Sequence, residues 1–290
     1  MKLAYYPGCT LHGTANEYDI SMKAVFKELG LELIEIPDWV CCGATSAHTT
    51  DENLALTLPF LHLVETEKMK LDTVTVPCAA CFNRLKITDY YAKNDKEKSE
   101  MMEHVVGKKY KKTVNVKHPL QNIIDDIGLE ELKKRVKKKL TNLRIAPYYG
   151  CLLLRPKEEL DFDDTENPSI MEKIIEALDA VPVDFSYKQE CCGASFSACK
   201  EEMANALTHK VIKDAKDNKA DCIMVACPLC HINLDLKQKD IEKQVNEQLN
   251  VPVLYFTQIL GLALGLSAKE LSLDSHFVDT MQLLKDKDII

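Results

Sequence analysis

The stretch Cys41-Cys42-Gly43-Ala44 returns in the second half of the chain as Cys191-Cys192-Gly193-Ala194. In each half a Gly-Cys dipeptide precedes this motif, and a Cys-x-x-Cys motif follows it. These flanking motifs are Gly8-Cys9 and Cys78-Ala79-Ala80-Cys81 in the first half, and Gly150-Cys151 and Cys227-Pro228-Leu229-Cys230 in the second. The cysteines of a copy are separated by 31 and 35 residues in the first half and by 39 and 34 in the second. Ten of the twelve cysteines follow this scheme, so the chain is a duplication organised around cysteine.

Length and charge limit what this cysteine pattern means. A chain of 290 residues is long enough for two domains that each bury a core, so disulfides are not needed for stability. Residues 1–6 do not resemble a secretory signal, and we therefore expect a cytoplasmic protein, in which dense cysteines indicate metal or redox chemistry. The formal net charge of −8 argues against nucleic acid as a partner.

Apolar runs alternate with helical patterns in both halves. Strands are expected at residues 3–6, 31–36 and 71–76, and again at 143–148, 181–185 and 221–226. Helices are expected between them, at 51–69, 169–178 and 201–216 and after Pro228. This order predicts an α/β fold of two duplicated Rossmann-like βαβ halves with parallel sheets, related by a pseudo-twofold axis. No Gly-x-Gly-x-x-Gly follows a strand, so dinucleotide binding is not supported.

Two segments lie outside the repeat. We expect a first unit at residues 1–140, made of the repeat (1–92) and a helical, Lys-rich connector (93–140), and a second unit at 141–290 that ends in a helical segment. The connector has 14 Lys or Arg and 8 Asp or Glu, a local net charge of 14 − 8 = +6. A solvated connector and a docking or anion-steering patch both fit this charge. The apolar run 251–268 is shorter than the ~20 residues that span a bilayer, which favours a buried helix or a partner-facing surface.

The cysteines follow the expected strands directly. Open α/β sheets bind ligands outside the carboxyl ends of their strands, so three loops should meet in one pocket per half. Helices that begin there direct N–H groups at the site, which favours negatively charged thiolates. Five thiols exceed the four ligands of a zinc ion, and adjacent cysteines suit a larger iron–sulfur cluster. Iron–sulfur is therefore favoured, with zinc as the alternative in at least one half.

The duplicated motif, with glycine after each Cys-Cys pair, resembles the CCG-domain proteins over nearly the whole chain. Within that family it is most similar to the catalytic B subunits of heterodisulfide reductases from methanogenic archaea. The resemblance implies two noncubane [4Fe-4S] clusters facing one another across a cavity, each held by one set of five cysteines. The implied ligands are Cys9, Cys41, Cys42, Cys78 and Cys81 in the first set, and Cys151, Cys191, Cys192, Cys227 and Cys230 in the second.

The same resemblance implies an oxidoreductase of methanogenesis that reduces the mixed disulfide of coenzyme M and coenzyme B to two thiols. A disulfide takes up two electrons, and two facing one-electron clusters would avoid a free thiyl radical. The implied partners are a C subunit with cubane iron–sulfur clusters and a flavin-bearing A subunit, together with a hydrogenase or formate dehydrogenase module. The alternatives are an electron-transfer subunit of a flavin- or quinone-linked dehydrogenase of the glycolate, lactate or succinate type, and a zinc-binding scaffold.

A few polar residues near the cysteines are candidates for further roles. His12, His48 and His231 are candidate proton donors, because imidazole titrates near neutral pH. Arg84 and Arg155 are candidate contacts for the anionic groups of the substrate. The two remaining cysteines, Cys199 and Cys222, are expected to be buried, small apolar side chains.

Overall fold

The computed structural model describes all 290 residues and contains two parallel four-stranded sheets. The first sheet has the order β2-β1-β3-β4 and the second the equivalent order β6-β5-β7-β8. All six strand pairings are parallel. The strands are β1 (Lys2–Tyr5), β2 (Glu32–Glu35), β3 (Thr73–Thr75), β4 (Asn115–Lys117), β5 (Arg144–Tyr148), β6 (Val181–Pro182), β7 (Cys222–Val225) and β8 (Val253–Tyr255). The predicted α/β fold of duplicated Rossmann-like halves is confirmed.

Helices connect the strands in both halves. The first half contains α1 (Gly8–Leu11), α2 (Asn16–Glu28), α3 (Ala47–Thr50), α4 (Glu52–Lys68) and α5 (Ala79–Asn94). The segment between the repeats contains α6 (Lys96–Val106), α7 (Pro119–Gln121), the π-helical η1 (Asn122–Ile127) and α8 (Leu129–Arg135). The second half contains α9 (Lys157–Leu160), α10 (Ile170–Ala177), η2 (Ala194–Phe196), α11 (Glu201–Asp217), α12 (Pro228–Leu236), α13 (Gln238–Val245), α14 (Phe256–Ala263), η3 (Leu273–Ser275) and α15 (Thr280–Asp286).

The predicted elements exist, and local chemistry explains several of their ends. Asp51 begins α4 as expected, because its carboxylate accepts a hydrogen bond from the Leu54 N–H at 2.8 Å. Residues of β3 and β7 are buried throughout, as is typical of parallel strands covered on both faces. The Cys78 and Cys227 residues are the N-caps of α5 and α12. Both helix N-termini are thus placed at cysteines.

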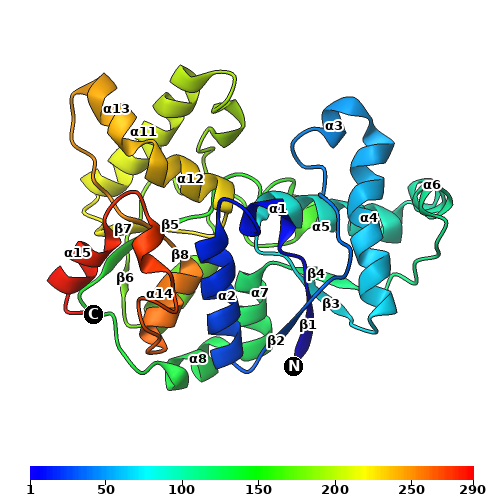
Figure 1. The fold of residues 1–290 in the computed structure, drawn as a ribbon, viewed down its shortest axis with the longest axis horizontal. Helices are drawn as coiled ribbons and strands as arrows, with labels where there is room; N and C mark the ends of the chain where they lie inside the picture. The colour runs from blue at the N-terminus through cyan, green and yellow to red at the C-terminus, as the bar shows by residue number, and fades with distance from the viewer.

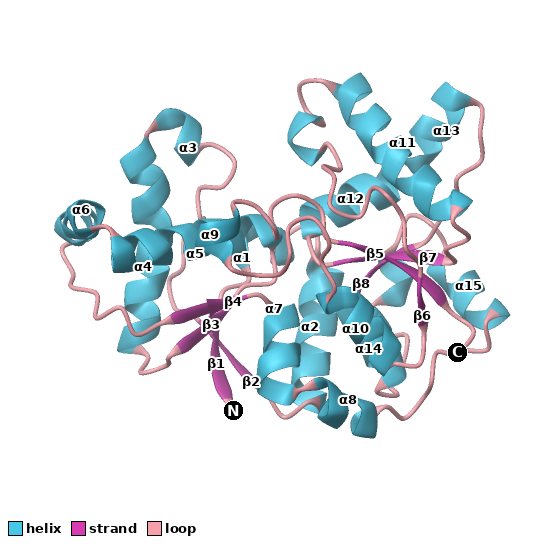
Figure 2. Cartoon of the chain, turned by 180° about the vertical axis from the view of Figure 1, so that it is seen from behind, coloured by secondary structure: helices cyan, strands magenta, loops and turns pink.

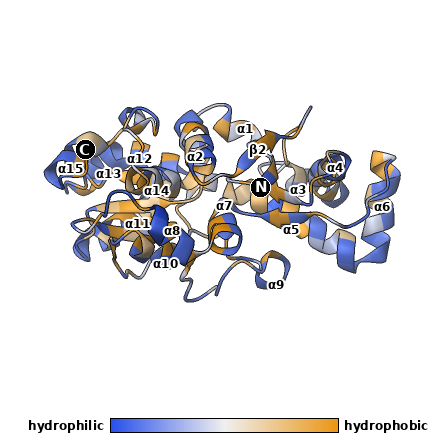
Figure 3. Ribbon diagram, turned by 90° about the horizontal axis from the view of Figure 1, so that it is seen from below, coloured by the Kyte–Doolittle hydropathy of each residue, from blue (hydrophilic) through white to orange (hydrophobic).

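Two strands lie where the sequence analysis predicted helix. Asn115–Lys117 of the Lys-rich segment forms β4 and completes the first sheet beside β3. Val253–Tyr255 of the apolar run forms β8 beside β7, and the buried helix α14 follows it. The segment 93–140 is therefore part of the first half as well as a connector. Its helices α6 and α8 carry mainly hydrophilic residues (Figure 3).

The two sheets lie on either side of the molecule with α2, α7 and α14 between them (Figures 1 and 2). The helix α2 of the first half packs on α14 of the second, and the hydroxyl oxygens of Ser21 and Thr257 are 2.7 Å apart across this contact. Tyr18 of α2 stacks on Tyr255 with ring centroids 4.1 Å apart. A single hydrophobic core of 81 buried residues runs through both halves, so the halves are not independent bodies. None of the helices combines the length and the apolar composition that a bilayer span requires.

Candidate metal centre

The five repeat cysteines of the first half meet beyond the ends of β1, β2 and β3. The sulfur atoms of Cys42 and Cys81 are 3.2 Å apart, and Cys81 also interacts with Cys78. The thiol of Cys41 is close enough to Cys9 to donate a hydrogen bond to it. Cys41 is exposed and Cys42 is buried, so the adjacent thiols face different partners. This divergence is what a ligand set for several metal ions requires.

The second half repeats the arrangement. The sulfur atoms of Cys192 and Cys230 are 3.6 Å apart, and the thiols of Cys151 and Cys191 interact with each other. All five repeat cysteines of this half line one cavity of about 30 Å³. Ala79 of the first half also lines it. The predicted convergence of cysteines far apart in sequence is therefore observed in both halves.

The two sets of cysteines meet each other. Cys78 at the N-terminus of α5 and Cys227 at the N-terminus of α12 lie close enough for each thiol to shift the pKa of the other. This contact raises the pKa of the Cys78 thiol, while hydrogen bonds from Cys230 and Cys78 lower the pKa of Cys227. Both cysteines are buried. The ten repeat cysteines thus form one continuous region at the junction of the halves.

His118 holds this junction together and was not predicted as a site residue. Its Nε2 atom lies 3.0 Å from the carbonyl oxygen of Pro77 and 3.2 Å from that of Ala226, the residues directly before Cys78 and Cys227. Its Nδ1 accepts a hydrogen bond from the Leu120 N–H at 3.3 Å, so the proton is on Nε2. Burial lowers the pKa of His118 to about 4. The neutral ring donates one proton to both carbonyls and ties the two Cys-x-x-Cys motifs together.

A tyrosine and a glycine support the cysteines in the same way in each half. Tyr6 donates its hydroxyl proton to the carbonyl oxygen of Val40 at 2.7 Å, and Tyr148 donates to that of Glu190 at 2.6 Å. These carbonyls directly precede the two Cys-Cys pairs. A Cβ atom on Gly8 would lie 3.0 Å from the Cys81 sulfur, and one on Gly150 would lie 3.2 Å from the Cys230 sulfur. Both glycines have positive φ, so a side chain there is doubly disfavoured.

Backbone N–H groups and one arginine favour the thiolate form of several repeat cysteines, although burial still raises the pKa of Cys41. Gly43 and Gly193 direct their N–H groups at the sulfur atoms of Cys41 and Cys191, at 3.4 and 3.3 Å. A hydrogen bond from Cys151 lowers the pKa of Cys191 to about 6. A hydrogen bond from Cys81 lowers the pKa of Cys42 to about 7, with help from the Ala44 N–H and the Arg84 charge. Thiolate is the form that binds metal.

Arg84 and Arg155, the predicted anion contacts, are linked by Asn83. The Asn83 amide nitrogen donates to the carbonyl oxygens of Leu152 and Arg155 at 3.1 and 2.8 Å, and its oxygen accepts from Arg84 at 2.8 Å. Asn83 thereby joins α5 of the first half to a loop of the second. The Arg155 guanidinium is exposed and pairs with Glu166 at 3.4 Å. The role of both arginines in substrate binding stays a prediction.

The three candidate histidines lie in different surroundings. His12 is exposed beside Trp39 and lies 3.4 Å from Glu35. His48 is exposed at the end of α3. His231 is buried, and its Nε2 contacts Val253 and His276. Their proton-donor roles stay predictions.

The two cysteines outside the repeat differ from each other. Cys222 is fully buried in β7, as expected. Cys199 is exposed, so its predicted burial is wrong. It lies in a surface turn after η2, outside the hydrophobic core.

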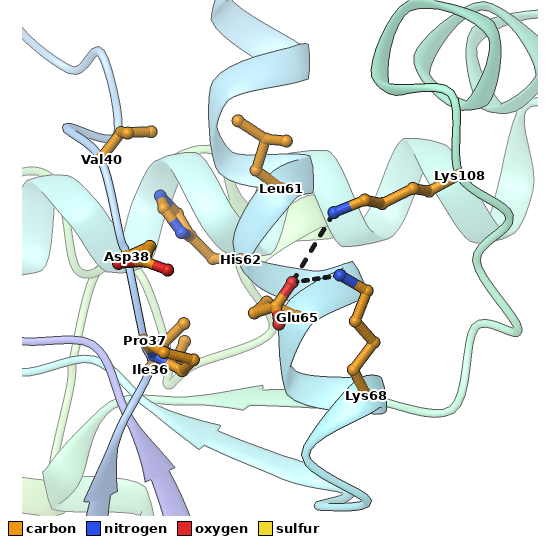
Figure 4. A pocket seen from close by; sticks show the side chains of 9 residues that line it. All are labelled: Ile36, Pro37, Asp38, Val40, Leu61, His62, Glu65, Lys68 and Lys108. Carbon is orange, nitrogen blue, oxygen red and sulfur yellow. Dashed lines mark hydrogen bonds and ion pairs between the residues drawn. The ribbon is translucent and has the colours of Figure 1, made fainter.

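A separate pocket of about 290 Å³ lies between the loop after β2, the helix α4 and Lys108 (Figure 4). Its wall includes His62, whose ring stacks on Tyr6 at 4.4 Å, and Glu65, which pairs with Lys68 at 2.6 Å and Lys108 at 3.8 Å. Burial lowers the pKa of His62 to about 4. No cysteine lines this pocket, so it is distinct from the metal centre.

A family model described as a cysteine-rich domain, CCG, matches residues 3–86 and 145–235. The chain belongs to the CCG family of cysteine-rich domain proteins. The two matched ranges are the two copies of the motif, so this CCG protein contains the domain twice.

Known proteins resemble this CCG protein along its length. It is 36% identical over 285 residues to the 8-methylmenaquinol:fumarate reductase membrane anchor subunit of Wolinella succinogenes, covering 97% of this chain and 99% of that one. It is 30% identical over 290 residues to the B subunit of the ferredoxin/F420H2-dependent CoB-CoM heterodisulfide reductase of Methanosarcina acetivorans, covering 98% and 96%. The predicted membership of the CCG family, with similarity to heterodisulfide reductase B subunits, is confirmed.

One solved structure has the same fold. The crystal structure of a hypothetical protein from Helicobacter pylori matches with a TM-score of 0.79 at 14% identity. The match covers 97% of this chain and 52% of that one, so this chain spans about half the length of that protein.

The glycines beside the Cys-x-x-Cys sulfurs provide the first test. We expect Gly8→Ala or Gly150→Ala to lose roughly half of the bound iron, the share of one cluster of two, because the new methyl group displaces a ligand sulfur. Iron and acid-labile sulfide are measured after anaerobic reconstitution. Gly30→Ala is the control, since Gly30 also has positive φ but a Cβ there meets nothing within 4 Å. Equal iron in all three variants would contradict the expectation.

His118 provides the second test. Replacing it in His118→Phe leaves the carbonyls of Pro77 and Ala226 without their donor, and we expect a loss of about 1–3 kcal/mol in the free energy of unfolding. The exposed His104 provides the control variant His104→Phe, which should change stability little.

The pH dependence of His118 has a definite sign. Its pKa is about 4 in the folded protein and about 6.5 in the unfolded chain. The unfolded chain therefore binds the proton first, and the contribution of His118 to stability is present above pH ~6.5 and is lost as the pH falls toward 4. Denaturation curves between pH 7 and 4 should show a shallower decline in His118→Phe than in the wild type. Parallel declines would show that His118 does not titrate on unfolding.

Proposed function

We propose that each set of five cysteines holds one noncubane [4Fe-4S] cluster, and that the two clusters act together on one substrate in an oxidoreductase complex. The observation that carries this proposal is the meeting of Cys78 and Cys227 across the junction of the halves. A protein that only stored two separate metal ions would gain nothing from this contact. When bound, the clusters would supply one electron each.

The donor set fits such clusters. All twelve cysteines are free thiols, and each repeat brings five of them together. Soft thiolates are the usual ligands of iron–sulfur clusters, and a tetrahedral zinc ion would leave one of the five unused. The lack of a side chain at Gly8 and Gly150 leaves room beside the sulfurs of Cys81 and Cys230. The chain thereby positions the cysteine ligands and keeps bulky side chains away from their sulfur atoms.

The substrate that we propose is a disulfide, by analogy with the relative named as part of a CoB-CoM heterodisulfide reductase. Cleavage of one S–S bond takes up two electrons and two protons and gives two thiols. In this chain the Arg84 guanidinium, which acts on Cys42, and Arg155 beyond Asn83 would bind the anionic groups of the mixed disulfide of coenzyme M and coenzyme B. His12 beside Cys9 is the accessible candidate for delivering protons. The electrons would come from partner subunits, a C subunit with cubane clusters and a flavin-bearing A subunit.

A second candidate function is favoured by the higher identity to a fumarate reductase subunit, 36% against 30% for the heterodisulfide reductase relative. In that function the same two clusters would relay electrons between a quinol and a flavoprotein partner, and no disulfide would be cleaved. The cysteine geometry serves both reactions, because both use two closely spaced redox centres.

The test combines metal analysis with two assays. Protein prepared without oxygen should contain about eight irons and eight labile sulfides per chain, and Cys42→Ser or Cys192→Ser should lower both by about half. Cys199→Ser is the control, because Cys199 is exposed and lies outside both sets. Two zinc ions without sulfide would overturn the cluster proposal.

The assays separate the two reactions. Reduced protein with its partner subunits should release both thiols from the heterodisulfide. Activity with fumarate and a quinol, without thiol release, would replace the first function by the second.

A further inference from the structure

Three side chains with metal-binding groups meet outside the cysteine sets. His231 and Asp235 lie one helical turn apart on α12, and His276 reaches them from the loop between η3 and α15. One ligand atom from each lies within 4.8 Å of the others. Positions i and i+4 of a helix present their side chains on one face, which is how two ligands are commonly brought to one ion.

We propose that His231, Asp235 and His276 bind a single divalent transition-metal ion, Zn²⁺ in the first instance, at a site separate from the two cysteine sets. The Nε2 of His231 is 2.9 Å from the Nδ1 of His276, and that atom is 3.9 Å from the Oδ2 of Asp235. Ligand atoms around a tetrahedral zinc ion at 2.0–2.1 Å lie roughly 3.3 Å apart. The observed spacings bracket this value, so small rotations of the side chains complete the site.

A backbone carbonyl supplies a fourth ligand atom. The carbonyl oxygen of Val253 lies 3.1 Å from the Nε2 of His231, and Val253 belongs to the edge strand β8. With neutral rings, a single proton would have to serve His231 Nε2, His276 Nδ1 and Val253 O together, while Asp235 Oδ2 accepts only from the Phe277 N–H. One proton satisfies at most part of this set, whereas a cation satisfies all four lone pairs. Two imidazole nitrogens with oxygen ligands suit Zn²⁺ and its first-row neighbours.

In the loop at 276–278 a polar side chain is buried and its apolar neighbour is exposed, which is the reverse of what hydrophobicity alone predicts. The His276 side chain is 1% exposed, whereas its neighbour Phe277 is 61% exposed. The N–H groups of Phe277 and Val278 donate to the Asp235 carboxylate at 2.8 and 3.0 Å, and they fix the loop in the register that turns His276 inward. A loop that exposes phenylalanine in order to bury histidine is organised around the imidazole.

The Asp235 carboxylate also has no cationic partner. Its side chain is fully buried, and no lysine or arginine lies within 4.0 Å of it. The backbone N–H groups of Phe277 and Val278 offset only part of the cost of burying this charge, and a cation would offset the rest. A divalent ion between Asp235 and the two imidazoles removes this cost.

The position of the site gives the metal a structural role. It would join the loop at 276–278 to α12, the helix that carries Cys230 directly before His231. The His231 ring stacks on Tyr255 at 4.2 Å, and Tyr255 stacks on Tyr18 of the first half. A metal here would stabilise the second Cys-x-x-Cys motif and the contact between the halves.

The experiment uses the full chain with its iron–sulfur clusters reconstituted, treated with one equivalent of Zn²⁺ and desalted. We expect about one zinc per chain in addition to iron, with a zinc K-edge EXAFS shell of nitrogen and oxygen at about 2.0–2.1 Å. His276→Ala and Asp235→Asn should lower the zinc affinity at least about tenfold and leave the iron content unchanged. The matched control is His104→Ala, on the exposed face of α6, which should keep the zinc.

Three results would overturn the proposal: no zinc retained by the wild type, a sulfur shell at about 2.3 Å that places zinc on the cysteines, or equal zinc in wild type and His276→Ala. The wild-type spectrum decides the matter alone if either variant fails to fold, which circular dichroism would show. Iron and sulfide analysis reports on the cysteine sets independently, so failure of one proposal is not mistaken for failure of the other.

Discussion

The whole arrangement depends on one proton, the one that His118 carries on Nε2 and shares between two carbonyl groups. These carbonyls belong to Pro77 and Ala226, which end the strand-to-helix turns of the two halves. The turns place Cys78 and Cys227 at the N-termini of α5 and α12, where backbone N–H groups favour thiolate. Because two helix N-termini and two buried thiols must lie close together, the junction needs a donor that is neutral and rigid. A fully buried imidazole with one fixed tautomer meets both requirements.

The same tyrosine and glycine contacts support the cysteines in both halves. Tyr6 and Tyr148 each hold the carbonyl before a Cys-Cys pair, and Gly8 and Gly150 each lie against the second sulfur of a Cys-x-x-Cys motif. The surroundings of these contacts have diverged. Tyr6 stacks on His62, whereas the ring that follows Tyr148, Tyr149, hydrogen-bonds to Glu172. The contacts next to sulfur are thus the same in both halves, and the layers behind them differ.

The sequence was informative wherever the signal was local. The six strands before cysteines and the convergence of each cysteine set follow from periodicity and from the position of loops in parallel sheets. The fourth strands were missed because β4 has only three residues in a charged segment, and because β8 merges with the apolar α14 that follows it. His118 and Asn83 were missed for a different reason. Their partners lie 41 to 108 and 69 to 72 residues away, and no spacing rule marks such contacts.

The two cysteine sets differ in access, and this difference bears on any reaction that uses both. Cys9 and Cys41 of the first set are exposed, whereas no cysteine of the second set is. The cavity of the second set is closed partly by Ala79, which belongs to the first half. Cys151 and Cys191 of the second set are partly exposed, so a molecule that arrives from solvent meets the first set most openly and the second set at these two cysteines. A shared substrate would have to span the junction that α5 and α12 form, past the Asn83 bridge and the two arginines beside it.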